Sequence, residues 1–292
     1  MDFEKLESFD KGVKIINVKN FELYDVFECG QCFRWEKSES GSYIGVAFGK
    51  VIEVNKIDND LFIYNTNEEQ FNNLWLDYFD LNRNYDEIKN SLSSDPILKE
   101  AIDFGAGIRL LKQEPFEMLI SFIISSNNRI PMIRRAINKI SEKYGKEIKY
   151  KEKVYYGFPS VTELSKATIE ELESCSVGFR AKYIKNTCEA VNNEKGLLNN
   201  IKSCDDDNCH EKLLDFMGVG PKVADCIMLF SMAKYSAFPV DVWVKRAMMH
   251  FYVAPDVSLK KIRDFGRNKF GSLSGFAQQY LFFYARENDI KI

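Results

Sequence analysis

The stretch at residues 213–233, "LLDFMGVGPKVADCIMLFSMA", decides how the second half of this chain is interpreted. It predicts a helix, a tight turn with two glycines, and a second helix that begins at Pro221, where proline is favoured. Gly218 and Gly220 leave backbone N–H groups exposed at a helix N-terminus, and such groups can bind a DNA phosphate without a charged side chain. A helical hairpin whose glycines only allow close packing is the open alternative.

Lys222 stands in the first turn of the second helix, where the aligned peptide dipoles disfavour a positive charge. Its apolar neighbours Val219, Val223 and Cys226 add a desolvation cost, so the neutral amine is favoured. A neutral lysine amine is a nucleophile suited to Schiff-base chemistry. The alternative is a lysine that extends into solvent for its charge alone.

The segment at residues 238–251, "FPVDVWVKRAMMHF", follows this helix and supplies a carboxylate. Pro239 and Val240 lead extended chain into Asp241, which is well placed to cap the next helix. A buried carboxylate near a nucleophilic lysine can also stabilise positive charge on a sugar or assist proton transfer. The two roles are compatible.

Composition bounds the class of protein. A chain of 292 residues with 45% hydrophobic and 14% aromatic content can bury a large core and divide into two or three domains. Its longest apolar run, residues 118–124, is far shorter than the roughly 20 residues that span a bilayer. We therefore expect a cytoplasmic protein with reduced cysteines and no membrane association. The net charge of −3 leaves nucleic-acid binding to local basic clusters.

The chain changes its periodicity once. Residues 33–65 alternate apolar and polar positions in short runs, which predicts an antiparallel meander, whereas residues from 68 onward follow a helical period. The predicted fold class is α+β: an N-terminal antiparallel sheet domain with flanking helices over 1–104, and a helical region over 105–292. Helix start signals recur along the chain, at Asp95, Glu114, Ser160, Thr168 and Ser258.

The hairpin and the segment "PVDV" at 239–242 resemble the helix-hairpin-helix (HhH-GPD) DNA glycosylases, which share a Gly/Pro-rich loop and an essential aspartate. Further segments resemble the Ogg-type 8-oxoguanine DNA glycosylases: "GQCFRW" (30–35), "GIRLLKQEPFEMLISFIISSNN" (107–128), "GFPS" (157–160), "GFRAKYI" (178–184) and "GFAQQYLF" (275–282). The resemblance divides the helical region into two subdomains. One spans 127–220. The other joins 114–126 to 221–292 and carries the hairpin 213–233 and the catalytic aspartate, with DNA in the cleft between the two subdomains.

This resemblance implies a bifunctional DNA-repair enzyme. It would excise 8-oxoguanine from double-stranded DNA by base flipping, with Lys222 attacking C1′ while Asp241 stabilises the cationic sugar. The Schiff base would then permit β-elimination at an abasic site. We expect a prokaryotic monomer that needs no metal or organic cofactor. Two alternatives remain: a related glycosylase for formamidopyrimidine or alkylated purines, and a non-catalytic DNA-binding module.

The family's functional positions transfer to this sequence residue by residue. The base pocket matches Gly30, Cys226, Gln278 and Phe282, with Pro239 beside them. The expected DNA-contacting residues are Asn127, Asn128, Met132, Phe179, Arg180, Gly218, Gly220, Val242 and Trp243. Met132 stands where the family has an arginine that reads the opposite cytosine, which predicts weaker discrimination among opposite bases. Phe179 and Trp243 stand where tyrosine and histidine are more usual.

The cysteines suggest a competing interpretation of a different class. "CGQC" at 29–32 together with Cys204, Cys209 and His210 could form a split zinc site or a redox pair. The second cluster lacks the short CxxC spacing of zinc ribbons, so we expect no zinc. No cysteine follows Cys226, so we expect no iron–sulfur cluster of the kind some relatives carry after the aspartate. The sequence leaves open whether a structural monovalent or divalent cation binds at the hairpin.

Overall fold

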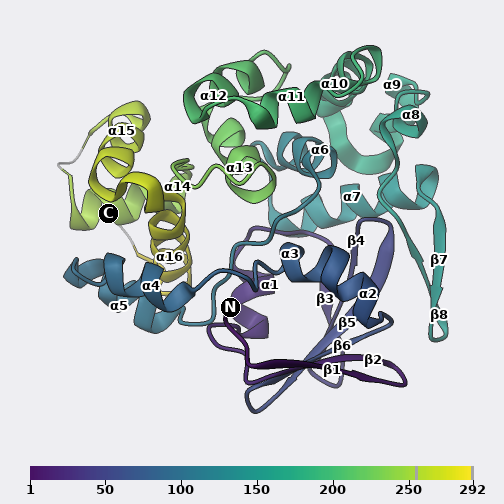
Figure 1. Ribbon diagram of the computed structural model, residues 1–292. Coiled ribbons are helices and arrows are strands. Elements are labelled where there is room, and N and C mark those ends of the chain that lie inside the picture. The colour runs from purple at the N-terminus through teal and green to yellow at the C-terminus, as the bar shows by residue number, and fades with distance from the viewer. Residues whose placement is uncertain (254–255, 291–292) are drawn as a thin grey trace.

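A six-stranded antiparallel sheet forms the N-terminal part of the computed structural model, which describes residues 1–253 and 256–290 (Figure 1). The strands lie in the order β1-β2-β6-β5-β4-β3. They are β1 (Lys5–Phe9), β2 (Gly12–Ile16), β3 (Trp35–Lys37), β4 (Tyr43–Ala47), β5 (Lys50–Ile57) and β6 (Asp60–Tyr64). The predicted meander over 33–65 is confirmed, and the N-terminal hairpin β1–β2 extends it because β2 pairs with β6.

Aromatic side chains fill the space between this sheet and the helices that cover it. The rings of Phe27 and Trp35 stack with their centroids 4.1 Å apart, and Trp35 Nε1 donates a 2.8 Å hydrogen bond to the hydroxyl of Tyr78. All three side chains are buried, so the indole N–H is satisfied inside the core. The sheet domain therefore has a hydrophobic core of its own.

The rest of the described chain is mainly helical. The helices of the first part are α1 (Leu23–Glu28), α2 (Glu68–Gln70), η1 (Phe71–Trp75), α3 (Leu76–Tyr78), α4 (Tyr85–Leu92) and α5 (Pro96–Phe104). The middle part contains α6 (Pro115–Ser125), α7 (Ile130–Tyr144), α8 (Val161–Leu164), α9 (Ile169–Leu172), η2 (Glu173–Val177), η3 (Gly178–Arg180), α10 (Ala181–Asn193), α11 (Leu197–Ser203) and α12 (Asp206–Leu214). The last part contains α13 (Pro221–Ser231), α14 (Val242–Phe251), α15 (Leu259–Phe270), η4 (Gly271–Leu273) and α16 (Ser274–Glu287).

Side-chain caps begin many of these helices, as the start signals predict. Asp95, Ser160 and Ser258 each accept a hydrogen bond from a backbone N–H of the first turn, and Thr168 forms a capping box with Glu171. Glu114 is an exception, because its side chain makes no capping bond and Pro115 alone marks the start of α6. Local sequence therefore fixes several helix starts before any tertiary contact forms.

A second, two-stranded sheet interrupts the helical region. It consists of β7 (Glu147–Tyr150) and β8 (Lys153–Tyr156), which the sequence analysis did not predict within 127–220. The hairpin descends beside the main sheet (Figure 1), where the Tyr150 hydroxyl donates a 2.8 Å hydrogen bond to Glu53 of β5. Its turn residue Lys151 has a φ of 53°, an unusual conformation for a lysine. Contact with the main sheet supports an element too short to be stable by itself.

The buried hydrophobic residues form two clusters, and the larger one extends beyond the predicted helical region. Leu98, Ala101 and Ile102 of α5 belong to that larger cluster, and α5 packs against α16. We keep the division into 1–104 and 105–292 as a proposal, with α5 lying beside the C-terminal helices in Figure 1. In the described part of the chain, no helix is long and apolar enough to cross a membrane.

Candidate active site

The turn between α12 and α13 is the hairpin that the glycines predict. Gly218 has a φ of 86°, and a Cβ at this position would lie 2.6 Å from the ring of Tyr183. A side chain is thus excluded both by conformation and by close packing. Gly220 has extended backbone and caps α13, and nothing lies within 4 Å of its Cβ position. Only Gly218 is needed for packing, and the open surroundings of Gly220 leave the N-terminus of α13 accessible.

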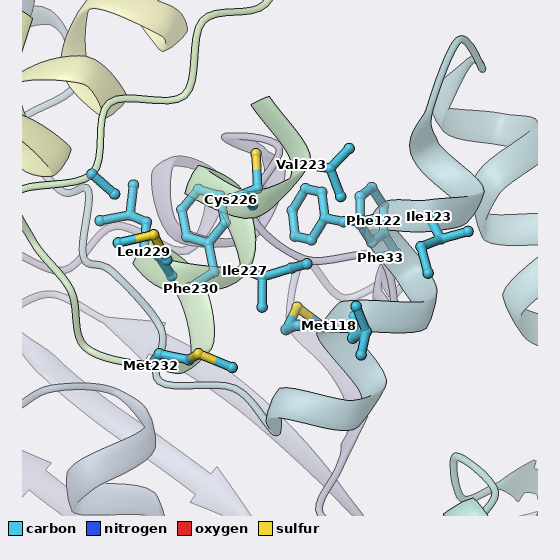
Figure 2. Close-up of a cluster of buried hydrophobic side chains, with 14 of the residues drawn as sticks. Phe33, Met118, Phe122, Ile123, Val223, Cys226, Ile227, Leu229, Phe230 and Met232 are labelled. Carbon is cyan, nitrogen blue, oxygen red and sulfur yellow. The ribbon is translucent and has the colours of Figure 1, made fainter. Parts of the chain in front are cut away.

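Helix α13 packs its apolar face on α6, and Lys222 lies at the border of this contact. Figure 2 shows Ile227 and Phe230 of α13 facing Met118 and Phe122 of α6, and the Phe122 and Phe230 rings stack with centroids 5.7 Å apart. The half-buried Lys222 places its Nζ 5.2 Å from the centroid of the Phe122 ring. The ammonium therefore faces an aromatic surface and is partly removed from water.

The other side of α13 is anchored by a buried ion pair. Asp225 is fully buried, and its two carboxylate oxygens accept bonds of 2.6 and 2.8 Å from Nε and Nη2 of Arg263 on α15. A bidentate pair of this kind fixes orientation as well as distance. Because Asp225 lies between Lys222 and Cys226 in sequence, the pair holds the rotation of α13 that places both of these residues on the cavity side.

Asp241 begins α14 and lies in the same site. Its carboxylate accepts hydrogen bonds of 3.0 Å from the N–H of Trp243 and 2.8 Å from the N–H of Val244. Burial raises the pKa of this carboxyl above its ordinary value, and the two N–H groups and the charge of Lys222 oppose the rise. Asp241 is thus both a helix cap and a half-buried carboxyl that shares the cavity with a lysine.

A cavity of about 310 Å³ lies between these elements, a volume within the range of small-molecule sites. It brings together ten of the residues predicted from the sequence. These are Gly30, Asn128, Lys222, Cys226, Pro239, Asp241, Val242, Trp243, Gln278 and Phe282. They come from the loop after α1, the loop before α7, helix α13, the segment that leads into α14, and helices α14 and α16, several of which are distant in sequence.

The polar groups of the cavity include one unpaired atom. Gln278 is buried, yet its Oε1 has no hydrogen-bond partner in the structure, whereas the next residue, Gln279, donates from Nε2 to the carbonyl of Cys29 at 2.6 Å. A buried polar atom without a partner is rare, and at the wall of a cavity the Gln278 Oε1 can accept a hydrogen bond from a bound ligand. Gly30 has a φ of 81°, and a Cβ there would lie 3.0 Å from the Phe282 ring. The backbone at Gly30 therefore reaches the cavity wall directly.

Cys226 shares the cavity with Lys222. Burial raises the pKa of its thiol to about 11, and the nearby Lys222 ammonium opposes the rise. The thiol is therefore neutral near pH 7. Together with the Phe282 ring, it supplies an apolar surface suited to a planar ligand.

The remaining predicted DNA contacts lie outside the cavity. Met132 and Phe179 are exposed to 41% and 59%, which is unusual for large apolar side chains. Arg180 differs from them, because its buried guanidinium donates to the backbone carbonyls of Ser126, Asn127 and Val177. In this structure Arg180 holds the corner before α7, where Asn127 has a φ of 49°.

Sequence reasoning missed several cationic residues at the site. Arg129 and Arg286 line the cavity, and the Arg246 guanidinium lies 4.7 Å from the Trp243 ring. A signal for Arg286 was present, because it follows Phe282 by four residues and so shares its face of α16. Arg129 could not be identified in this way, since it lies in a loop.

The cysteine cluster is not brought together. All seven cysteines are free, and Cys29 and Cys32 belong to different hydrophobic cores. Within residues 1–253 and 256–290, no group of three or more histidine, cysteine or acidic side chains is placed to hold a metal ion.

Two family models match consecutive parts of this chain. Residues 14–119 match the N-terminal domain of 8-oxoguanine DNA glycosylase, and residues 120–277 match the HhH-GPD superfamily of base excision DNA repair proteins. The chain therefore belongs to the HhH-GPD superfamily, the class that its hairpin and helical core define.

Individual relatives narrow this class. The chain is 64% identical to the Clostridium acetobutylicum 8-oxoguanine glycosylase/lyase. The crystal structure of that protein with double-stranded DNA containing cytosine opposite 8-oxoguanine matches with a TM-score of 0.98, covering 99% of this chain and 100% of that one. The N-glycosylase/DNA lyase OGG1 of Arabidopsis thaliana is 31% identical over 88% of this chain and 75% of its own length. A probable N-glycosylase/DNA lyase of Methanothermobacter thermautotrophicus is 33% identical over 73% of this chain and 74% of its own length. Within its superfamily the chain is thus an Ogg-type 8-oxoguanine DNA glycosylase.

Proposed function

We propose that this protein is a bifunctional DNA-repair enzyme that removes 8-oxoguanine from double-stranded DNA and then cleaves the abasic strand. The observation that carries the proposal is the cavity in which Lys222, Asp241 and Gln278 meet. A site for phosphate contact alone needs no amine, half-buried carboxyl and unpaired amide oxygen gathered in one cavity. The names of the relatives point to the same activity.

The cavity can receive a base only when the nucleotide leaves the DNA stack. The flipped base would lie between the Phe282 ring and the Cys226 thiol, with the Gln278 amide at its polar edge. 8-Oxoguanine carries an N–H at N7 where guanine has an acceptor. The Gly30 carbonyl would accept a hydrogen bond from this N–H, because a glycine lets the base approach the backbone.

Lys222 supplies the nucleophile. Its Nζ lone pair would form a bond to C1′ while the electrons of the C1′–N9 bond leave with the base, which takes up a proton. Asp241 stabilises the positive charge that develops on the sugar, and it is held in place by the N–H groups of Trp243 and Val244. Opening of the sugar ring gives a Schiff base, from which β-elimination releases the 3′ phosphate. The amine and the carboxylate suffice for these steps, so the reaction needs no metal or organic cofactor.

The DNA would run along the exposed rim beside the cavity. Phe179 and Met132 offer apolar surface for the space that the flipped base leaves, and Asn127 and Asn128 lie at the corner before α7. Gly218, Gly220, Val242 and Trp243 would contact the backbone of the lesion strand. Met132 cannot donate a hydrogen bond to cytosine, so we expect similar rates opposite cytosine and adenine. The similarity to a Clostridium protein supports a prokaryotic, cytoplasmic setting.

Borohydride trapping tests the function directly. Wild type and Lys222→Gln are incubated with duplexes that carry 8-oxoguanine, a formamidopyrimidine lesion or unmodified guanine. We expect a covalent adduct only with wild type and on 8-oxoguanine. An adduct on formamidopyrimidine alone would favour the related lesion specificity. Base release without an adduct would mean a monofunctional glycosylase. If neither base release nor an adduct is detected, the protein would be a DNA-binding module without catalytic activity.

A further inference from the structure

Arg286 stands at the wall of the base pocket without a role in the reaction described above. It lies one helical turn after Phe282 on α16, and its guanidinium carbon is 5.3 Å from the centroid of the Phe282 ring. Its Nη1 lies 3.5 Å from the position that a Cβ of Gly30 would occupy. The guanidinium is therefore adjacent to the glycine that is proposed to read N7 of the base.

Two of the three guanidinium nitrogens are already occupied. Nε donates to Glu287 Oε1 at 3.0 Å, and Nη2 donates to the carbonyl of Glu28 at 2.6 Å and pairs with Glu287 at 2.8 Å. Nη1 has no hydrogen-bond partner among the described residues, and only 16% of the side chain is exposed. The bonds at Nε and Nη2 fix the plane of the group, which leaves an oriented, unused donor at the pocket wall.

The chemistry of the lesion calls for such a donor. 8-Oxoguanine differs from guanine at two adjacent positions, an N–H donor at N7 and a carbonyl acceptor at C8. A backbone carbonyl beside a guanidinium N–H presents the complementary acceptor and donor in the same order. Unmodified guanine offers the reverse at N7 and only a C–H at C8, so both protein groups would be left unpaired.

We propose that Arg286 is a specificity-determining residue whose Nη1 donates a hydrogen bond to the C8 oxygen of the flipped 8-oxoguanine while the Gly30 carbonyl accepts from N7–H. The inference rests on the proposed function and deepens it. Guanine is then rejected at two atoms, one of which only the arginine reads. Since a hydrogen bond to a charged group is worth more than a neutral one, the arginine should supply a substantial share of the discrimination.

The test is equilibrium binding in the Lys222→Gln background, which prevents turnover. Three duplexes are compared: 8-oxoguanine opposite cytosine, guanine opposite cytosine, and a tetrahydrofuran abasic analogue opposite cytosine. Arg286→Met keeps an apolar stem over Phe282 but removes the donor. We expect it to weaken binding of the 8-oxoguanine duplex about 10- to 100-fold, with the other two duplexes unchanged within about twofold.

The matched control is Arg246→Met. Arg246 stacks on Trp243 and does not line the cavity, so its loss should weaken all three duplexes by the same factor. An equal loss on all three duplexes in Arg286→Met would overturn the inference in favour of a phosphate contact. Retention of the parent's full preference for 8-oxoguanine would overturn it as well.

Two further measurements distinguish failure of this inference from loss of folding and from failure of the proposed function. Thermal melting checks the fold, and Arg286→Leu, which is shorter and has no hydrogen-bond donor, is measured on the same duplexes if Arg286→Met unfolds. A full preference in that variant likewise overturns the inference. If the Lys222→Gln parent itself shows no preference for 8-oxoguanine over guanine, the proposed function fails and this inference fails with it.

Discussion

Two cations inside this protein, Arg109 and Lys222, lie in opposite kinds of surroundings. Arg109 is fully buried where the sheet domain meets the helical core, and its Nη1 donates to Asp2 at 2.8 Å. Its Nε donates to the carbonyl of Phe79 at 3.0 Å, and its guanidinium carbon lies 4.0 Å from the Tyr85 ring centroid. Every face of the group is used.

Lys222 is only half buried and faces a cavity. Among the described residues its ammonium has the Phe122 ring and the Cys226 thiol as neighbours and forms no ion pair. The comparison shows what separates a structural charge from a chemical one. The structural charge has all its partners within the fold, whereas Lys222, the proposed nucleophile, shares a cavity with Asp241 but has no ion pair in the described part of the chain and is left free to react.

The largest expected effect is at Lys222. Lys222→Gln should lower single-turnover excision of 8-oxoguanine by at least about 10³-fold, because the nucleophile is lost, with the melting temperature nearly unchanged. Rapid-quench assays and thermal melting on the same preparation measure both quantities. Large destabilisation with residual excision would place Lys222 in the same structural category as Arg109.

The opposite outcome is expected at Arg109. Arg109→Met leaves the buried Asp2 carboxylate unpaired and should lower the free energy of unfolding by about 3–5 kcal/mol. The excision rate per folded molecule should not change, since Arg109 does not line the cavity. Urea denaturation followed by tryptophan fluorescence, with active-site titration, provides the measurement. A lower excision rate per folded molecule with an unchanged free energy of unfolding would contradict the structural role of Arg109.

Gly30 gives an intermediate effect. Gly30→Ala adds a methyl group 3.0 Å from the Phe282 ring at a φ of 81°, and it should slow 8-oxoguanine excision about 10- to 100-fold by displacing the base. Cleavage of a preformed abasic site should change by less than about threefold, because no base has to be accommodated. Gly196→Ala is the matched control, since Gly196 has a φ of 82° and nothing within 4 Å of its Cβ position. Equal losses in both variants would assign the effect to backbone strain.

The smallest effect concerns pH. Burial raises the pKa of Asp241, so its carboxyl takes up a proton at a higher pH than an exposed aspartate does. The protonated form cannot stabilise a cationic sugar, so the excision rate should fall, by up to about tenfold per pH unit, as the pH drops through this raised value. The decrease is measured as the single-turnover excision rate at saturating DNA across this pH range. Binding of the abasic analogue is measured over the same range. A rate that stays flat down to the ordinary pKa of aspartate would contradict the role assigned to Asp241.

Much of this molecule could be predicted from local sequence. Alternation over 33–65 predicts the strands, capping residues predict several helix starts, and "GVGPK" predicts the hairpin, because each of these signals acts over a few residues. The hairpin β7–β8 was missed because its two strands have four residues each and depend on the main sheet for support. The superfamily could be read from the sequence because its signature lies in short motifs, and the proposed catalytic pair, Lys222 and Asp241, lies in the same motifs.

The sequence by itself determined the α+β class, the hairpin, and the positions of a lysine and an aspartate at the N-terminal ends of two consecutive helices. Only the tertiary structure decided that Gly30, Lys222 and Phe282 surround one cavity, that Arg180 is turned inward to backbone carbonyls, and that Arg286 has an unused donor beside Gly30. The physical reason is the distance along the chain over which each interaction acts. Capping, turn conformation and periodicity act between near neighbours in the chain, whereas burial and hydrogen-bond satisfaction depend on segments as distant in sequence as α1 and α16.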